Sequence, residues 1–247
     1  MKLRLVLNLI IFSFYYKLYL VFYVLKYNFN SGINFLKNDK YFGSLIKEIA
    51  PPLFPQKKTY NEYFQSLAKY IIYQQLSIKS AQKIYMRFLS LFEKNKINTK
   101  NFKKITYSEL IQIGISKSKI KYIDNVAERF IKDKNFLKNI TSMSDNQIIS
   151  NLIDIKGVGP WTADMFLMFT LCRFDVFPIK DLGIKKGIQK LFKLDILPTD
   201  SFMIQKSKNW SPYRTICCLY LWKLIDENDF EWYYKIINFV NAFYVKK

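Results

Sequence analysis

Residues 154–160, DIKGVGP, contain the tightest turn in this sequence and limit most strongly how the chain can fold. Glycine is rare, with seven in 247 residues, yet Gly157 and Gly159 stand one residue apart and Pro160 follows directly. Glycine permits a backbone with positive φ, and proline suits the first turn of a helix. The stretch therefore predicts two helices joined by a short hairpin. Such a hairpin can hold a phosphate through backbone N–H groups, although an ordinary turn between helices has the same pattern.

Helical periodicity continues through the rest of the chain, and no alternation typical of β-hairpins occurs. The pattern predicts helices over 60–92 with a break near Leu76, and over 117–133, 142–155, 160–171, 182–192, 200–226 and 229–244. Ser77, Ser116 and Ser144 are placed to cap three of these helices. The clearest breaks between them are 50–56 and 173–180. The sequence predicts an all-α fold.

The chain is strongly basic, with 39 Lys and Arg against 19 Asp and Glu and a net charge of +20. This charge predicts a polyanionic partner, either nucleic acid or a lipid surface. The composition is rich in Lys, Asn, Ile, Phe and Tyr, which is typical of AT-biased codons. Part of the positive charge can therefore reflect drift towards lysine. The sequence has no histidine, which excludes histidine-based general bases, triads and zinc sites. Its three cysteines form no CxxC pair and indicate a reducing compartment.

The first thirty residues differ from the rest of the chain. Residues 3–25 are apolar apart from Arg4, Asn8, Ser13 and Lys17, and they approach the length that spans a bilayer. A lysine near the centre of such a span costs about 2.5–3.5 kcal/mol. Three interpretations remain open: a membrane anchor, a helix packed on the domain, or upstream sequence outside the true coding region. The third is weakened because the next methionine is Met86.

Five ordered blocks of the sequence resemble the helix-hairpin-helix DNA glycosylase superfamily, specifically the 3-methyladenine DNA glycosylase II type. The blocks are IIYQQLSIKSAQKIYMRF, IGISKSKIKYI, IKGVGPWTADMFLMF, DVFPIKDLGI and WSPYRTICCLYLW. The resemblance covers about residues 35–245. It implies two helical subdomains that flank a DNA-binding cleft. The larger would comprise residues 60–172, the smaller residues 31–59 with 173–247, and residues 1–30 would be an extension.

By this resemblance the catalytic aspartate is Asp181, at the start of the helix 182–192. Breaking an N-glycosidic bond builds positive charge on the sugar, which a nearby carboxylate stabilises. An alkylated base already carries positive charge, so it can leave without a general acid. The alternative role for an aspartate at a helix start is simple capping. Asp175 is the second candidate for the catalytic aspartate, but it is expected to be a structural cap.

Trp161 bears on the type of reaction. In the bifunctional relatives of the endonuclease III kind, the residue two places after the second hairpin glycine is a lysine that forms a Schiff base. Here that place is occupied by Trp161, so the resemblance implies hydrolysis without cleavage of the DNA backbone. The iron–sulfur cluster of many such relatives requires four cysteines and is not expected.

The same resemblance indicates a pocket for the extruded base. Trp161 and Tyr213 would line it, although Trp161 could equally pack in the core, and Trp210 is expected to be structural. Met165 and Leu182 stand where some relatives have tyrosines, so a less aromatic pocket is expected.

The contacts with DNA are expected at two loops. Leu76 would fill the gap left by the extruded nucleotide, with Gln75 beside it; a core leucine between two helices is the alternative. The hairpin would contact phosphates through Lys156, Gly157, Val158 and Gly159. Lys119, with its neighbours Lys117 and Lys121, is a further candidate for contact with the DNA backbone.

The sequence therefore predicts a monofunctional DNA glycosylase that excises alkylated purines in base excision repair. Its partner would be double-stranded DNA with a flipped damaged base, and no metal or redox cofactor or protein partner is expected; the resemblance leaves open whether the hairpin carbonyls hold an ion. A monomer located with DNA in the cytoplasm is predicted, with membrane attachment through residues 1–30 left open. The alternatives are an inactive helix-hairpin-helix DNA-binding protein and a glycosylase for a different damaged base.

Overall fold

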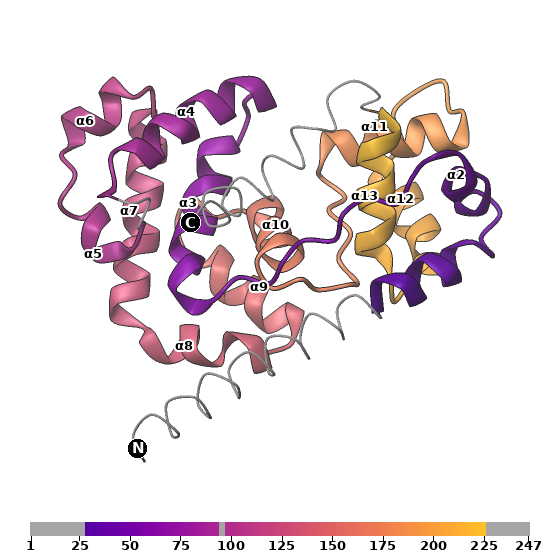
Figure 1. The fold of residues 1–247 in the computed structure, drawn as a ribbon, viewed down its shortest axis with the longest axis horizontal. Coiled ribbons are helices and arrows are strands. Elements are labelled where there is room, and N and C mark those ends of the chain that lie inside the picture. The colour runs from indigo at the N-terminus through magenta and orange to yellow at the C-terminus, as the bar shows by residue number, and fades with distance from the viewer. Residues whose placement is uncertain (1–27, 94–96, 226–247) are drawn as a thin grey trace, which may run out of the picture.

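The computed structural model describes residues 28–93 and 97–225, and all regular elements in these ranges are helical (Figure 1). The first described residues, 28–36, are helical. The later elements are α2 Phe42–Glu48, η1 Tyr60–Glu62, α3 Tyr63–Tyr73, α4 Ile78–Ser90, α5 Thr99–Phe102, α6 Tyr107–Gln112, α7 Lys117–Lys132, α8 Lys134–Asn139, η3 Ile140–Ser142, α9 Asp145–Ile153, α10 Pro160–Phe169, α11 Leu182–Phe192, α12 Asp200–Ser207, η4 Lys208–Trp210 and α13 Arg214–Ile225. The predicted all-α fold is confirmed.

The starts of three helices are capped by the predicted serines. Ser77, Ser116 and Ser144 accept hydrogen bonds from the backbone N–H groups of Ser80, Lys119 and Gln147, respectively. Ser144 and Gln147 also form a reciprocal capping box. Each such cap stabilises its helix by about 1 kcal/mol, so these boundaries follow from local chemistry.

The helices form two groups, which are separated in Figure 1 by the segments that cross between them. Helices α3 to α10 make up one group, in which α3 packs against α4, α7 and α10. Helices α2 and α11 to α13 make up the other, and α11 packs along α13. Buried apolar residues from both groups belong to one continuous core. The expected subdomain boundaries at 59/60 and 172/173 remain a prediction.

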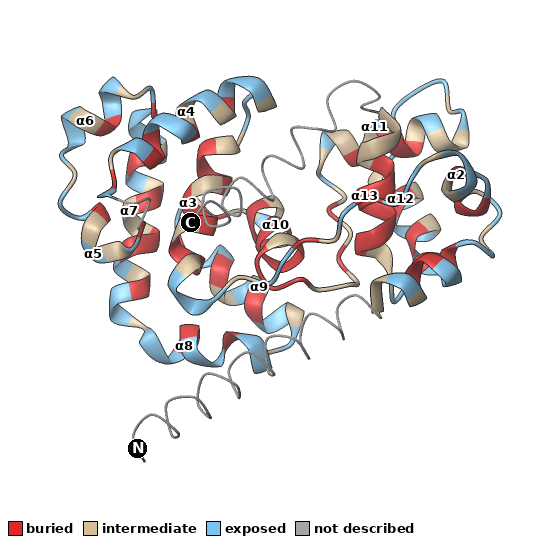
Figure 2. Ribbon diagram, in the orientation of Figure 1, coloured by how far each residue is buried: buried red, intermediate tan, exposed pale blue. Residues whose placement is uncertain are grey.

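Helix α13 is the most deeply buried element of the second group (Figure 2). All residues from Thr215 to Leu221 are buried, on every side of the helix. Two of its buried residues are Cys217 and Cys218; these and Cys172 are free thiols. A helix with apolar residues on every side must be covered on every side, so α13 is the element against which α2 and α11 of the second group pack.

The prediction of one helix over 200–226 is wrong. The chain instead forms α12, the short turn η4, and then α13 after Ser211 and Pro212. Proline lacks the N–H that a helix requires and disfavours helical backbone in the residue before it. The predicted helix over 229–244 lies outside the described residues.

Four short helices, α2, α5, α6 and α8, were not predicted. They have four to seven residues, too few to show a clear period. Among the described residues, no helix is both long enough and apolar enough to span a bilayer. The candidate membrane segment lies almost wholly outside those residues.

Candidate active site and DNA-binding surface

The hairpin between α9 and α10 requires glycine at position 157. Its φ is +104°, and a Cβ there would lie 2.1 Å from Cγ of Tyr122 on α7. Gly159 differs, because its φ is −95° and an added Cβ would meet no atom within 4 Å. The first glycine thus lets the hairpin pack on α7, and the second leaves open space beside its backbone.

Side chains from α7 and from the end of α3 bond to the carbonyls of the hairpin. Asn125 of α7 donates to the carbonyl of Lys156 at 2.8 Å, and Gln74 donates to the carbonyl of Gly157 at 3.0 Å. The Lys156 side chain is exposed, as a phosphate contact requires. The Val158 side chain is buried, so only its backbone is available to a ligand.

The loop between α3 and α4 exposes Leu76, which is 39% accessible. The alternative of a core leucine at this position is therefore wrong. Gln75 beside it adopts a left-handed backbone with φ +55°, which turns the chain sharply between the two helices. Such a residue is uncommon outside turns and functional loops.

Lys119 does not point outward from α7. Its ammonium group donates to the carbonyls of Ile72 and Gln74, each at 2.8 Å, and partial burial lowers its pKa. It therefore caps the end of α3 and fixes the loop that carries Leu76. Contact between Lys119 and a phosphate stays a prediction; two of the three N–H donors of its ammonium group are used by these carbonyls.

Asp181 caps α11 and receives three hydrogen bonds on its carboxylate. Oδ1 accepts from the backbone N–H of Ile184 at 2.8 Å and from Nε1 of Trp222 at 2.9 Å. Oδ2 accepts from Nε1 of Trp161 at 2.8 Å. The carboxylate thus joins α10, α11 and α13, and it is neither fully buried nor fully exposed. Sequence reasoning did not single out Trp222.

The lysines beside Asp181 are directed elsewhere. Lys180 forms an ion pair with Asp200, and Lys185 reaches the other oxygen of Asp200 at 2.9 Å. The described partners of Asp181 are consequently uncharged N–H groups. These donors orient the carboxylate without neutralising its charge.

A second carboxyl group, Asp164, lies one turn after Trp161 on α10. Burial raises the pKa of Asp164 to about 7, and the negative charge of Asp181 acts in the same direction. Cys218 on α13 lies near both carboxylates, and burial together with their charges raises the pKa of its thiol. Sequence reasoning gave Asp164 no role.

The expected pocket residues differ in burial and in their contacts. Trp161 contacts it directly and Leu182 follows it on the surface with 55% exposure. Met165 is only 5% exposed, so it belongs to the core. The Tyr213 ring packs at 5.4 Å from that of Phe35 and at 6.5 Å from that of Phe174.

The two residues expected to be structural have structural contacts. Trp210 is 1% exposed, and its Nε1 donates to Asp39. Asp175 pairs with the Arg214 side chain at 2.6 Å and accepts from the Arg214 backbone N–H at 3.4 Å, at the start of α13. It caps this helix and anchors the segment that leads to Asp181.

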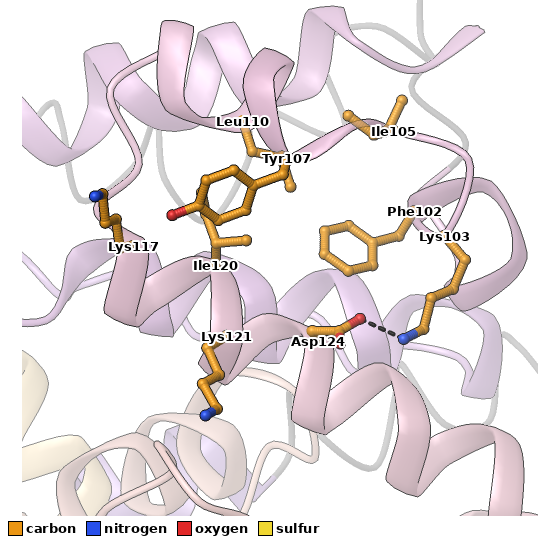
Figure 3. Close-up of a pocket in the computed structure, with 9 residues that line it drawn as sticks. All are labelled: Phe102, Lys103, Ile105, Tyr107, Leu110, Lys117, Ile120, Lys121 and Asp124. Atoms are coloured by element: carbon orange, nitrogen blue, oxygen red, sulfur yellow. Dashed lines mark hydrogen bonds and ion pairs between the residues drawn. The ribbon is translucent and has the colours of Figure 1, made fainter.

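A pocket of about 540 Å³ lies away from Asp181, between α5, α6 and α7 (Figure 3). Phe102, Leu110 and Ile120 form apolar walls, and Lys117 and Lys121 stand on α7. Lys103 is paired with Asp124 across it. None of the residues that line this pocket contacts the Asp181 cluster in the described hydrogen bonds.

Known proteins resemble this chain in both sequence and fold. Residues 68–212 match the family described as HhH-GPD superfamily base excision DNA repair protein. DNA-3-methyladenine glycosylase 1 of Schizosaccharomyces pombe is 31% identical over 195 residues, which cover 78% of this chain and 83% of that protein. A Bacillus subtilis relative is 32% identical over 169 residues, which cover 66% of this chain and 59% of the relative.

A solved structure shows the same arrangement. The Schizosaccharomyces pombe 3-methyladenine DNA glycosylase in complex with abasic DNA superposes with a TM-score of 0.74 at 27% identity. The match covers 81% of this chain and 98% of the other. Together with the family match over more than half of the sequence, these findings lead to one conclusion: the chain belongs to the HhH-GPD superfamily of base excision DNA repair proteins.

Proposed function

We propose that this protein is a monofunctional DNA glycosylase that releases alkylated purines, such as 3-methyladenine, from double-stranded DNA. The observation that carries the proposal is the Asp181 carboxylate, oriented by two indole N–H groups and a helix start. Relatives that bear the name DNA-3-methyladenine glycosylase support this substrate class. The complex of the fission yeast enzyme with abasic DNA supports DNA as the partner.

The chemistry follows from charge. As the bond between the sugar C1′ and the base nitrogen breaks, its electron pair leaves with the base and C1′ becomes cationic. A fixed carboxylate beside the sugar stabilises that cation without reorganising during the reaction. Water then adds to C1′ and passes a proton to the solvent. A methylated base leaves as a neutral molecule, so Asp181 need not donate a proton.

Geometry indicates which carboxylate oxygen faces the sugar. Oδ1 already accepts two hydrogen bonds, while Oδ2 accepts one from Trp161. Because each carboxylate oxygen has two lone-pair sites, Oδ2 has one left for the attacking water or the sugar. Trp161 stands at that oxygen, in a position to stack on a cationic base.

Cleavage of the DNA backbone after base release is not part of the proposed reaction. A lyase step needs an amine that forms an imine with C1′, and Trp161 occupies the place where a resemblance to bifunctional relatives would put that lysine. The expected product is an intact strand with an abasic site. We further propose that the protein acts as a monomer, without metal or protein partner. Its proposed location is the cytoplasm, where DNA is present and conditions are reducing.

The decisive experiment uses DNA methylated with dimethyl sulfate. We expect the wild-type protein to release free methylated purine, and Asp181→Asn to lose at least hundredfold in rate while it still binds DNA. Treated strands should break only after alkali, because only an abasic site is alkali-labile in this way. Breakage without alkali would contradict the monofunctional assignment.

Two alternatives have distinct outcomes in the same experiment. Binding without base release by the wild type would favour an inactive DNA-binding protein. Release from a panel of duplexes with uracil or oxidised bases, but not from methylated DNA, would favour a glycosylase for a different lesion. The three hydrogen bonds on Asp181 favour an enzyme, because a mere helix cap needs only the bond from Ile184.

A further inference from the structure

Trp222 on α13 places its indole against the start of α11. Its Nε1 donates to Oδ1 of Asp181 at 2.9 Å, and its ring lies 5.8 Å from that of Phe169 on α10. The donor therefore comes from the most buried helix of its group, and an aromatic side chain of a third helix supports it. Such a donor cannot follow Asp181 if the carboxylate rotates.

Gly183 provides the space that this indole occupies. A Cβ at position 183 would lie 2.8 Å from both Cδ1 and Nε1 of Trp222, and 3.0 Å from Oδ1 of Asp181. Glycine lowers helix stability by about 1 kcal/mol relative to alanine. Its presence in the first turn of α11 is thus explained by the close approach of the indole to the backbone.

We propose that Trp222 and Gly183 together are the positioning device for Asp181. The indole fixes Oδ1, so that the carboxylate cannot turn and Oδ2 remains directed at the reacting sugar. Trp222 acts through Asp181 and is not itself in contact with the substrate. This inference rests on the proposed function for its effect on rate, but the positioning itself can be observed without activity.

Trp161 and Trp222 have different tasks in this arrangement. Trp161 binds Oδ2, the oxygen with a free lone-pair site, and so lies at the side where the substrate is expected. Trp222 binds the oxygen that also accepts from the helix start, so that both lone-pair sites of Oδ1 are used. Substitution of Trp161 should therefore affect substrate binding and rate, whereas substitution of Trp222 should affect rate alone.

The first test uses the indole N–H signals of ¹⁵N-tryptophan in NMR spectra. The chain has four tryptophans, so the signals can be assigned with single Trp→Phe variants. In Asp181→Ala, we expect the signals of Trp161 and Trp222 to move upfield as they lose a charged acceptor. The Trp210 signal should stay, because Trp210 donates to Asp39. An unmoved Trp222 signal would overturn the inference.

The second test measures single-turnover base release. Trp222→Phe keeps an aromatic ring and removes the donor, and we expect the rate to fall about tenfold to hundredfold. The affinity for abasic DNA should change by less than about threefold. Gly183→Ala should lower the rate at least as much, because its Cβ would displace the indole and crowd Oδ1 of Asp181, even though alanine favours the helix.

The rate losses of Trp222→Phe and Gly183→Ala should not add fully, because both variants remove the hydrogen bond between Trp222 and Asp181. Trp210→Phe is the matched control: it removes an indole–carboxylate bond elsewhere, so it should lower stability and leave the rate unchanged. If Trp222→Phe releases base within about twofold of the wild-type rate, the inference is overturned and the proposed function stands. If the wild type releases no base, the proposed function fails and the NMR result alone decides the positioning.

Discussion

At the scale of single residues, the ionised carboxylate of Asp164 destabilises the folded state because it is partly buried. Burial raises the pKa of the Asp164 carboxyl from its usual value of 3.8 to about 7. Between these two values the folded state binds more protons than the unfolded chain, so the free energy of unfolding falls as pH rises. The pKa of Asp164 is raised at a cost in stability, and the charge of Asp181 contributes to the shift. Asp164 is therefore a candidate for a role in the active site.

The prediction for Asp164 concerns stability against pH. From pH 5 to pH 8, Asp164→Asn should gain about 1–3 kcal/mol in unfolding free energy relative to the wild type, because the amide has no charge to bury. Urea denaturation at both pH values measures this difference. A difference between the two proteins that is equal at pH 5 and pH 8 would contradict the burial of an ionisable group here.

At the scale of elements, substitutions of the two hairpin glycines should distinguish effects on folding from effects on DNA binding. Gly157→Ala should destabilise the protein by about 2–4 kcal/mol, because alanine at φ +104° is strained and its Cβ overlaps Tyr122. Gly159→Ala should change stability by less than about 1 kcal/mol, since nothing lies near its Cβ.

The same pair tests the hairpin as a phosphate site. If a phosphate approaches the open backbone at Gly159, Gly159→Ala should weaken binding of abasic DNA while the protein stays folded. Thermal unfolding and fluorescence anisotropy with labelled duplex measure the two effects separately. Unchanged binding by Gly159→Ala would place the phosphate elsewhere.

The loop between α3 and α4 gives a further prediction. Leu76→Ala should hardly alter stability, because Leu76 is exposed. It should slow base release from duplex DNA about tenfold or more and spare release from a single strand, where no stacking is lost on extrusion. Rates on matched duplex and single-stranded substrates provide the comparison. Equal slowing on both would argue against insertion of Leu76 into the duplex.

Helix boundaries were predictable where a cap and a clear period occur together. Ser77, Ser116 and Ser144 mark starts that the structure reproduces, and Asp181 begins α11 as expected. The break after Trp210 was missed although Pro212 marks it, since proline lacks the N–H that a continuous helix requires. Short helices such as α5 depend on packing partners that are distant in sequence.

At the scale of the whole molecule, the basic charge makes a prediction about salt. Lys156→Ala should lower the slope of the logarithm of affinity against the logarithm of salt concentration by about 1, as expected for one lost phosphate contact. Lys103→Ala is the control, because Lys103 is paired with Asp124 and Glu128. Titrations at several salt concentrations give both slopes. Equal slopes for wild type and Lys156→Ala would remove Lys156 from the contacts.

The arrangement of the site could be predicted from the sequence only in part. Asp181 and Trp161 were identified by family resemblance, and the structure brings them into contact. Trp222 and Asp164 were not, because their proximity to Asp181 arises from the packing of α13 and α10 around α11. The bonds from Lys119 to the carbonyls of Ile72 and Gln74 could not be predicted, because lysines are abundant here and the sequence does not mark which of them bonds to the backbone.

Gln74 has a consequence for how a duplex would be handled. Its side chain reaches the hairpin and Thr162, while its own carbonyl is held by Lys119. Gln74 thereby links the hairpin, which we propose to bind the DNA strand, to the loop that carries Leu76. If a duplex binds as proposed, Leu76 would stand at a fixed position relative to the hairpin and would block the return of a base that opens by thermal motion.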